Sequence, residues 1–344
     1  MQIPNFKLTK PLVTLSAIGS LIGGTLLLKD VLGGAKYTEE TSARGKIVIV
    51  TGANTGIGKA IARELAKRKA KVIMACRDLD KCEKARKEVV LESKNKYVLC
   101  RKCDLASQES IRAFAEEVKK ENKKINVLIN NAGVSGCRKM LTEEKIELQL
   151  GVNHMGHFLL TMLLLDKLQE SAPSRIINVS SVAHKRGTIN KEDLNSENSY
   201  DPTQAYNQSK LANVLFTREL AKRLEGTGIT VNAVHPGIVN TDILRHSSYY
   251  DSWLSTVVLK PLVWLFIKSP RQGAQTIVYA SLDPSLENVS GKYFAECREA
   301  ETSPDAQDDG LAKWLWMVSE KWTKSSISDQ LLTNSGISNQ LVFK

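Results

Sequence analysis

Residues 46–58, KIVIVTGANTGIG, constrain the fold more than any other part of the sequence. Apolar and β-branched residues lead into a turn where Gly52, Gly56 and Gly58 have the spacing G-x-x-x-G-x-G, and a helix-like pattern follows. Such a turn can hold a pyrophosphate, because glycine lets the backbone approach the phosphates and the first N–H groups of the helix face their charge. Glycine turns between a strand and a helix also occur for purely structural reasons, so the motifs downstream have to decide.

Strand-like and helix-like segments alternate beyond this turn for about 250 residues, the order expected of a parallel sheet covered by helices on both faces. We therefore predict an α/β fold with a Rossmann-type, doubly wound parallel sheet of about seven strands in a single domain. An amphipathic helix with three tryptophans is expected after Asp305. The strands are expected at residues 47–51, 71–75, 97–100, 126–130, 175–180, 230–235 and 291–294.

The N-terminal region contains an uncharged apolar run at residues 11–28, with lysines on both sides. A helix of this length reaches about 27 Å, just short of the ~30 Å hydrocarbon core, so it is a marginal span. A membrane anchor is favoured, and an interfacial helix and a cleaved signal peptide are the alternatives. We expect an N-terminal apolar helix acting as anchor or targeting segment at 1–36, a polar linker at 37–45, the main domain at 46–323 and a polar tail at 324–344.

Charge and cysteine usage exclude some classes of function. The net charge is +11 and the pI about 9.2, but the basic residues are mixed with acidic ones and no basic block is interleaved with aromatics. We therefore expect no nucleic-acid partner, and a solvated surface, an anionic cofactor or a membrane explains the charge. The six cysteines have no framework spacing, which favours a reducing compartment or simply unpaired thiols. The histidines have no metal-ligand spacing, so no metal is expected.

Tyr206 and Lys210 are four residues apart, so a helix would place them on one face, one turn apart. A free tyrosine has a pKa near ~10, and a cation within ~4–6 Å lowers the pKa of a neighbouring acid by ~1–3 units. That would bring the phenol towards the working range of a general acid or base. Y-x-x-x-K is common on amphipathic helices, so the pair gains meaning only beside the glycine turn.

Together, the glycine turn, this pair and several further motifs resemble the short-chain dehydrogenases/reductases, in the family's order over nearly all of residues 46–294. The segments ACRD, NHMGHF, VSSVAH and SGKYF are similar to the retinol dehydrogenase branch of that family. The family motifs are TGANTGIG at 51–58, NNAG at 130–133, Asn153 in GVNHMGHF, NVSS at 178–181, Tyr206-x-x-x-Lys210 and HPG at 235–237.

The resemblance implies the roles of four catalytic residues. Tyr206 would donate and accept the proton, and Lys210 would lower the pKa of Tyr206 and bind the nicotinamide ribose. Ser181 would hold the substrate oxygen, and Asn153 would complete a proton relay. Ser180 is the competing candidate for the role of the serine.

The resemblance also implies a site for NADP(H). Members that prefer NAD carry an acid where this chain has Cys76, whereas Arg77 offers a cation to the 2′-phosphate of NADP. A solvated Arg77 is the alternative. Lys69 stands where many members have glycine at a helix end, which should cost local stability. The expected cofactor-binding residues are Gly52, Ala53, Asn54, Thr55, Gly56, Ile57, Gly58, Arg77, Asp104, Leu105, Asn131, Ala132, Tyr206, Lys210 and Thr241.

The function that the resemblance implies is NADPH-dependent interconversion of retinal, or a similar apolar aldehyde, and retinol by hydride transfer. The apolar segment at residues 253–267 suits such a substrate. The alternatives are a reductase of other lipophilic carbonyls, such as lipid aldehydes or steroids, and a non-catalytic cofactor-binding scaffold. The N-terminal segment looks closest to a mitochondrial member of the branch. We therefore favour the mitochondrial inner membrane over the endoplasmic reticulum membrane, and a homodimer is a candidate assembly.

Overall fold

The computed structural model describes residues 20, 23–24, 29, 33–239 and 267–325. Most of the predicted anchor at residues 1–36 lies outside the described residues. So do Thr241, residues 253–266 of the apolar segment and residues 326–344 of the polar tail. The described ranges contain every other predicted site residue.

Within the described residues, eight strands form one sheet in the order β3-β2-β1-β4-β5-β6-β7-β8. Strands β1 to β7 are parallel, and β8 pairs antiparallel with β7. The chain order reverses between β1 and β4, and a doubly wound sheet opens a ligand crevice at the carboxyl ends of its strands at such a point. The strands are β1 (Ile47–Thr51), β2 (Lys71–Cys76), β3 (Val98–Lys102), β4 (Val127–Asn130), β5 (Ser174–Val179), β6 (Ile229–His235), β7 (Tyr293–Ala295) and β8 (Arg298–Glu299).

The seven predicted strands are all present, with ends displaced by no more than two residues. The prediction of about seven strands missed β8. This strand consists of two exposed, charged residues, so it carries no alternating pattern that the sequence could reveal. It returns along β7 through Glu296 and Cys297, whose φ angles are +51° and +53°.

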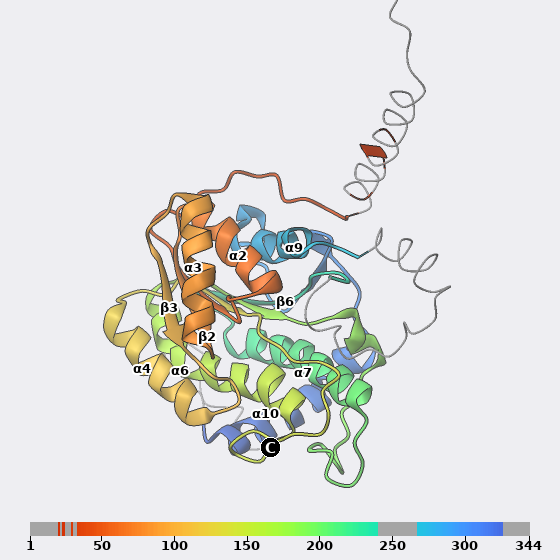
Figure 1. The fold of residues 1–344 in the computed structure, drawn as a ribbon. Helices are drawn as coiled ribbons and strands as arrows, with labels where there is room; N and C mark the ends of the chain where they lie inside the picture. The colour runs from red at the N-terminus through yellow and green to blue at the C-terminus, as the bar shows by residue number, and fades with distance from the viewer. Residues whose placement is uncertain (1–19, 21–22, 25–28, 30–32, 240–266, 326–344) are drawn as a thin grey trace, which may run out of the picture.

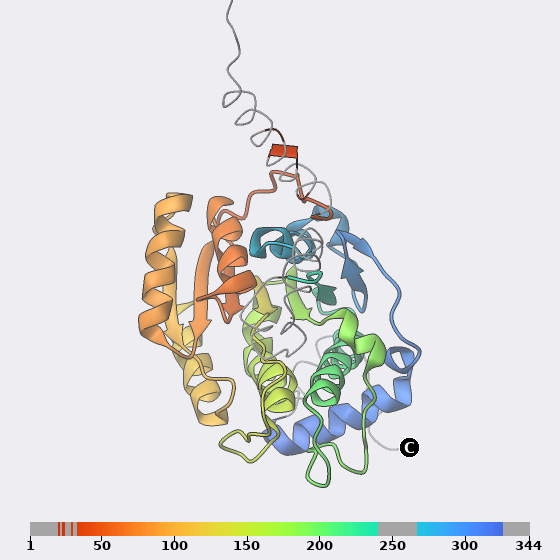
Figure 2. The same cartoon turned by 45° about the vertical axis from the view of Figure 1, so that its right-hand side comes forward.

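Helices cover both faces of the sheet, as predicted (Figures 1 and 2). Helices α2, α3 and α9 bury one apolar layer against it, and α4, α6 and α7 bury the other. The helices are α2 (Gly56–Lys67), α3 (Leu79–Ser93), α4 (Gln108–Glu121), α5 (Leu148–Leu150), the π-helical turn η1 (Gly151–Met155), α6 (Gly156–Glu170), η2 (Val182–Arg186), α7 (Pro202–Arg223), α9 (Pro270–Leu282), η5 (Pro284–Leu286), η6 (Asp305–Gln307) and α10 (Asp309–Thr323).

One described helical stretch, Leu148–Glu170, is long and apolar enough to cross a membrane. Within the protein, 89% of its apolar window is buried. The stretch comprises α5, η1 and α6, and it packs between the sheet and α10. Its apolar character is therefore explained by its place in the core.

The predicted tryptophan-bearing helix is α10, which lies across α6 and α7 (Figure 2). Trp316 is 2% exposed. Its ring lies 5.0 Å from that of Phe158 and 6.0 Å from that of Phe216, measured between centroids. This aromatic cluster extends the apolar layer beneath the sheet, and it explains why the helix carries an apolar stripe.

The segment at 37–45 is packed against the domain. Tyr37 is buried with its ring 5.6 Å from that of Tyr279 on α9, and the guanidinium of Arg68 lies over it. Ala43 is fully buried, and its N–H donates to the carbonyl oxygen of Arg68. The segment therefore holds the start of the domain against α2 and α9.

Lys69 ends α2 in a left-handed conformation, with φ +71°. The N–H of Lys69 donates to Ala66 O and that of Ala70 to Leu65 O, the paired bonds of a Schellman motif. Glycine is favoured at this position because a Cβ strains the left-handed backbone. The left-handed backbone therefore explains why a lysine at this position is expected to lower local stability.

Replacing Lys69 with glycine is expected to raise the free energy of unfolding by about 1 kcal/mol, because the left-handed strain is removed. Urea denaturation of the purified protein measures this. Lys67→Gly is the matched control. It lies in the last turn of the same helix, where glycine should lower the free energy of unfolding by about 1 kcal/mol. Equal losses in both variants would contradict the argument.

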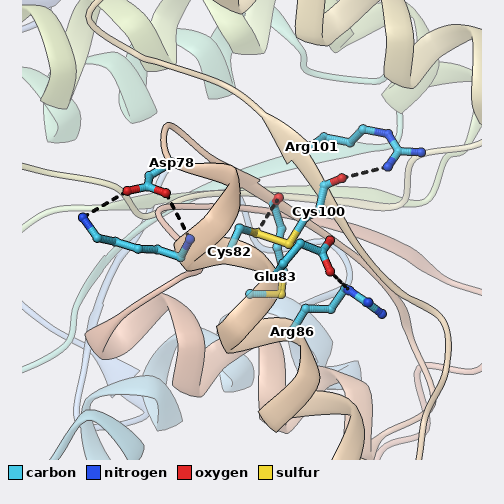
Figure 3. Close-up of a disulfide and its surroundings, with 8 residues drawn as sticks. Asp78, Cys82, Glu83, Arg86, Cys100 and Arg101 are labelled. Carbon is cyan, nitrogen blue, oxygen red and sulfur yellow. Dashed lines mark hydrogen bonds and ion pairs between the residues drawn. A yellow bond between two sulfur atoms is a disulfide. The ribbon is translucent and has the colours of Figure 1, made fainter.

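Cys82 and Cys100 form a disulfide between α3 and β3 (Figure 3). The expectation of unpaired thiols is therefore wrong for these two residues. They are 18 positions apart and meet only because α3 packs back over β2 and β3, a contact that no sequence spacing reveals. The bond ties the first half of α3 to the sheet. The other cysteines, Cys76, Cys103, Cys137 and Cys297, are free.

Candidate active site

The glycine turn after β1 leaves the N-terminus of α2 open to a ligand. Gly52 and Gly56 have φ angles of +64° and +52°, and a Cβ on Gly58 would lie 2.2 Å from the carbonyl oxygen of Gly52. Glycine is therefore required by the turn itself. Thr55 precedes α2 and makes no side-chain hydrogen bond to its first turn. The first N–H groups are thus not capped by that side chain, as suits a phosphate.

The end of β4 is bonded to this turn. The N–H groups of Asn131 and Ala132 both donate to Thr51 Oγ1 at 2.9 Å, and Asn131 Nδ2 donates to Thr51 O at 2.9 Å. A Cβ on Gly52 would lie 3.0 Å from Ala132. The predicted cofactor residues of β1 and β4 therefore form one surface at the point where the sheet order reverses.

The end of β2 presents a thiol and a cation to the same edge of the sheet. Cys76 is 1% exposed, and burial raises the pKa of its thiol to about 11, so it stays neutral. The backbone N–H groups of Ala53 and Asn54 contact it. Arg77 is exposed, and within the described parts of the chain it makes no ion pair. This end of β2 therefore presents the Arg77 guanidinium beside a neutral thiol, while the carboxylate of the next residue, Asp78, caps α3 and pairs with Lys81.

Asp104 and Leu105 follow β3 at the same edge. The side chain of Asp104 accepts a hydrogen bond from Ala106 N at 3.0 Å, which fixes the loop. Leu105 is 7% exposed, and its carbonyl oxygen lies so close to Gly156 that a Cβ there would approach to 2.6 Å. The loop therefore lies against the start of α6.

Tyr206 and Lys210 lie one turn apart on α7, as their spacing predicted. The Lys210 Nζ lies 5.6 Å from the centre of the Tyr206 ring and donates to the carbonyl oxygen of Val179 at 3.1 Å. A Cβ on Gly133 would lie 3.6 Å from the same nitrogen. The pair is therefore at the carboxyl ends of β4 and β5, on the edge of the sheet that carries the glycine turn.

Burial has the largest effect on the pKa values of both side chains. It raises the pKa of the Tyr206 phenol, which a hydrogen bond with Ser181 partly offsets, and it lowers the pKa of Lys210 to about 8. Desolvation disfavours the charged form of each group. The lowering of the Tyr206 pKa by Lys210 stays a prediction.

The two candidate serines are used differently. Ser181 follows β5, its Oγ accepts from Ala183 N at 3.2 Å, and its side chain is near enough to the Tyr206 phenol to lower the pKa of that group. Ser180 is 2% exposed, and its hydroxyl donates to the carbonyl oxygen of Lys210 at 2.8 Å. Ser180 thus holds α7 against the sheet, whereas Ser181 is the serine beside the phenol.

Asn153 lies in the π-helical turn η1. Its Nδ2 donates to Val134 O and to Ser209 Oγ at 2.9 Å each, and its Oδ1 accepts from Val134 N at 2.8 Å. A Cβ on Gly133 would lie 3.2 Å from Oδ1, beside Lys210. A π-helical turn inside a helix is rare and frequent at functional sites. Asn153 is thus joined to the same group as Tyr206 and Lys210.

Comparison with known proteins decides the family. The short chain dehydrogenase family model matches residues 46–250. The chain belongs to this family. Mouse retinol dehydrogenase 13 is 52% identical over 311 residues, which cover 90% of this chain and 93% of that protein. The resemblance to the retinol dehydrogenase branch is thereby confirmed, and this short-chain dehydrogenase is an oxidoreductase with the expected Rossmann-type fold.

Solved structures agree with this assignment. A crystal structure of an uncharacterized protein from Mycobacterium paratuberculosis matches with a TM-score of 0.69 and 36% identity, covering 86% of this chain and 99% of the other. The RhlG/NADP active-site complex of Pseudomonas aeruginosa matches with a TM-score of 0.59 and 25% identity, covering 79% of this chain and 98% of the other. That neighbour was solved with NADP in its active site.

Sequence reasoning missed two buried residues that hold this dehydrogenase's site together. Ser209 links Asn153 to α7, since its hydroxyl lies 2.7 Å from the carbonyl oxygen of Tyr206 and bonds to Asn153 Nδ2. His157 contacts both Thr51 and the backbone of Asn153. The only sequence signal for either was its place beside a family motif, in SKLAN and NHMGHF.

Proposed function

We propose that this protein is an NADPH-dependent reductase that converts retinal, or a similar apolar aldehyde, to the alcohol. The observation that carries the proposal is the grouping of Ser181, Tyr206 and Lys210 beside the glycine turn. The uncapped N-terminus of α2 and the close-packed glycines suit a pyrophosphate, so the residues present fit a dinucleotide.

The proposed chemistry adds a hydride to the carbonyl carbon and a proton to the carbonyl oxygen. When bound, NADPH supplies the hydride. Tyr206 gives the proton, and its raised pKa keeps the phenol protonated at neutral pH, as a proton donor requires. Ser181 holds the substrate oxygen beside the phenol. Lys210 binds the nicotinamide ribose, and Asn153 fixes the buried polar groups behind it.

Two exposed apolar side chains support a lipophilic substrate. Val182 follows Ser181 and is 41% exposed, and Ile238 follows the HPG motif and is 60% exposed. They come from the carboxyl ends of β5 and β6, which are neighbours in the sheet. An apolar surface next to a proton donor suits a carbonyl carried by a hydrocarbon. The name of the related retinol dehydrogenase favours a retinoid.

A substrate comparison tests this function. NADPH oxidation by the purified full-length protein should give a higher kcat/KM with all-trans-retinal than with a medium-chain aldehyde or a steroid ketone. A long apolar chain buries more surface, at about 0.8 kcal/mol per methylene. Preference for the medium-chain aldehyde would favour the general carbonyl reductase. NADPH binding without oxidation by any of these carbonyls would favour the non-catalytic scaffold.

We also propose that residues 1–36 attach the enzyme to a membrane, with the mitochondrial inner membrane favoured over the endoplasmic reticulum. The uncharged run at residues 11–28 supports this location. The homodimer stays a prediction of the sequence.

A further inference from the structure

His157 is a buried histidine that joins two parts of the candidate site. It lies on the first turn of α6 and is 2% exposed. Its Nε2 is 2.9 Å from Thr51 Oγ1, at the end of β1. Its Nδ1 is 3.0 Å from the carbonyl oxygen of Asn153, in the π-helical turn. One ring therefore spans the distance between the glycine turn and Asn153.

The partners of the ring fix its tautomer. A carbonyl oxygen can only accept, so Nδ1 carries the proton and donates it to Asn153 O. Nε2 is then an acceptor and receives the hydroxyl proton of Thr51. Burial lowers the pKa of His157 to about 3, so the ring is neutral at any physiological pH. It therefore orients its neighbours and carries no catalytic proton.

Thr51 continues the same chain of hydrogen bonds. Its oxygen accepts from the N–H groups of Asn131 and Ala132, both at 2.9 Å, which uses its two lone pairs. Its hydroxyl proton is left for His157, since the other acceptor, Ile129 O, is farther away at 3.4 Å. This line of hydrogen bonds therefore runs from the end of β4 through Thr51 and His157 to Asn153, and every polar atom along it has a partner.

We propose that His157 is a positioning residue for the reaction, which holds the π-helical turn and Asn153 in register with the cofactor turn. This inference rests on the proposed function. The side chain of Asn153 is fixed by Val134 and Ser209, and the backbone contact to His157 ties its turn to β1 through a single side chain. Without this ring, Asn153 and the glycine turn would be connected only indirectly, through the loop at residues 131–134.

His154 offers a matched control on the same stretch of helix. It is 1% exposed, and burial lowers its pKa to about 4, so it matches His157 in environment. Its Nε2 contacts Ser319 on α10, away from the site. If the protein only needs a buried ring at each position, replacing either histidine should have the same effect on kcat. If His157 positions the site, only its replacement should lower kcat strongly.

Kinetics of three variants test the proposal. His157→Leu should lower kcat about 10- to 100-fold, the usual effect of a small misplacement at an active site. His154→Leu should change kcat less than about 3-fold even if its stability falls, since its ring contacts Ser319, Phe158 and Phe216 and, among the described residues, bonds to neither Thr51 nor Asn153. His157→Asn keeps a donor near the position of Nδ1 and should recover part of kcat. Equal kcat losses in the two leucine variants, or no loss in His157→Leu, would overturn the proposal.

A second measurement does not depend on turnover. Nitrogen NMR of histidine-labelled protein should show His157 as the neutral Nδ1–H tautomer, unchanged between about pH 5 and 8. The Nε2–H tautomer, or protonation in that range, would refute the hydrogen-bond line even if the kinetics agreed. An inactive wild-type enzyme would refute the proposed function, while the NMR result would still decide whether the line exists.

Discussion

Replacing Tyr206 with phenylalanine is expected to lower kcat for carbonyl reduction by about 10²- to 10⁴-fold, the usual contribution of a positioned proton donor. The substitution keeps the ring beside Lys210 and removes only the hydroxyl, which lies near Ser181. NADPH should still bind, because the glycine turn and the end of β2 are unchanged. Steady-state kinetics and a fluorescence titration with NADPH measure the two quantities separately.

Tyr279→Phe is the control for this substitution. Tyr279 lies on α9, where its ring packs between Tyr37 and Phe294, so loss of its hydroxyl should leave kcat within about 2-fold. If Tyr206→Phe retained more than about a tenth of the wild-type kcat, the phenol would not be the proton donor. Loss of NADPH binding in that variant would instead mean that the substitution disturbs the cofactor site.

Local patterns made most of the sheet predictable. Each predicted strand is a short apolar run, and the glycine turn and the Tyr206–Lys210 pair depend on neighbours within one turn of a helix. Such features depend on residues that are close together in the sequence, so a single sequence is enough to predict them. The expectation for Lys69 came instead from the family resemblance, in which many members have glycine at this helix end, and the structure has a left-handed backbone there.

Features that depend on packing between distant segments were not predictable. The disulfide joins α3 to β3, and β8 exists only because a turn folds it back on β7. Burial of α7 against the sheet raises the pKa of Tyr206, an effect that the Tyr206-x-x-x-Lys210 spacing does not show. The line through His157 links three elements across more than a hundred positions, which no spacing in the sequence could indicate.

Arg77→Asp is expected to reverse the cofactor preference. The proposed role of Arg77 is to pair with the 2′-phosphate of NADP, and a hydrogen bond to a charged group contributes about 1.5–3 kcal/mol. Its loss should therefore lower kcat/KM for NADPH about 10- to 100-fold, and repulsion between the new carboxylate and the phosphate would add to this. The carboxylate can instead accept the ribose hydroxyls of NADH, so kcat/KM for NADH should rise.

Kinetics with both cofactors, run on Arg77→Asp and on Arg86→Asp, would decide whether position or charge is responsible. Arg86 lies on α3, two turns beyond its start, and pairs with Glu83 (Figure 3). Reversing its charge changes the net charge of the protein equally, but away from the end of β2. Arg86→Asp should therefore leave the ratio of the two kcat/KM values unchanged. An equal loss for NADPH and NADH in Arg77→Asp would refute phosphate selection, because a cation that pairs with the 2′-phosphate cannot affect a cofactor that lacks it.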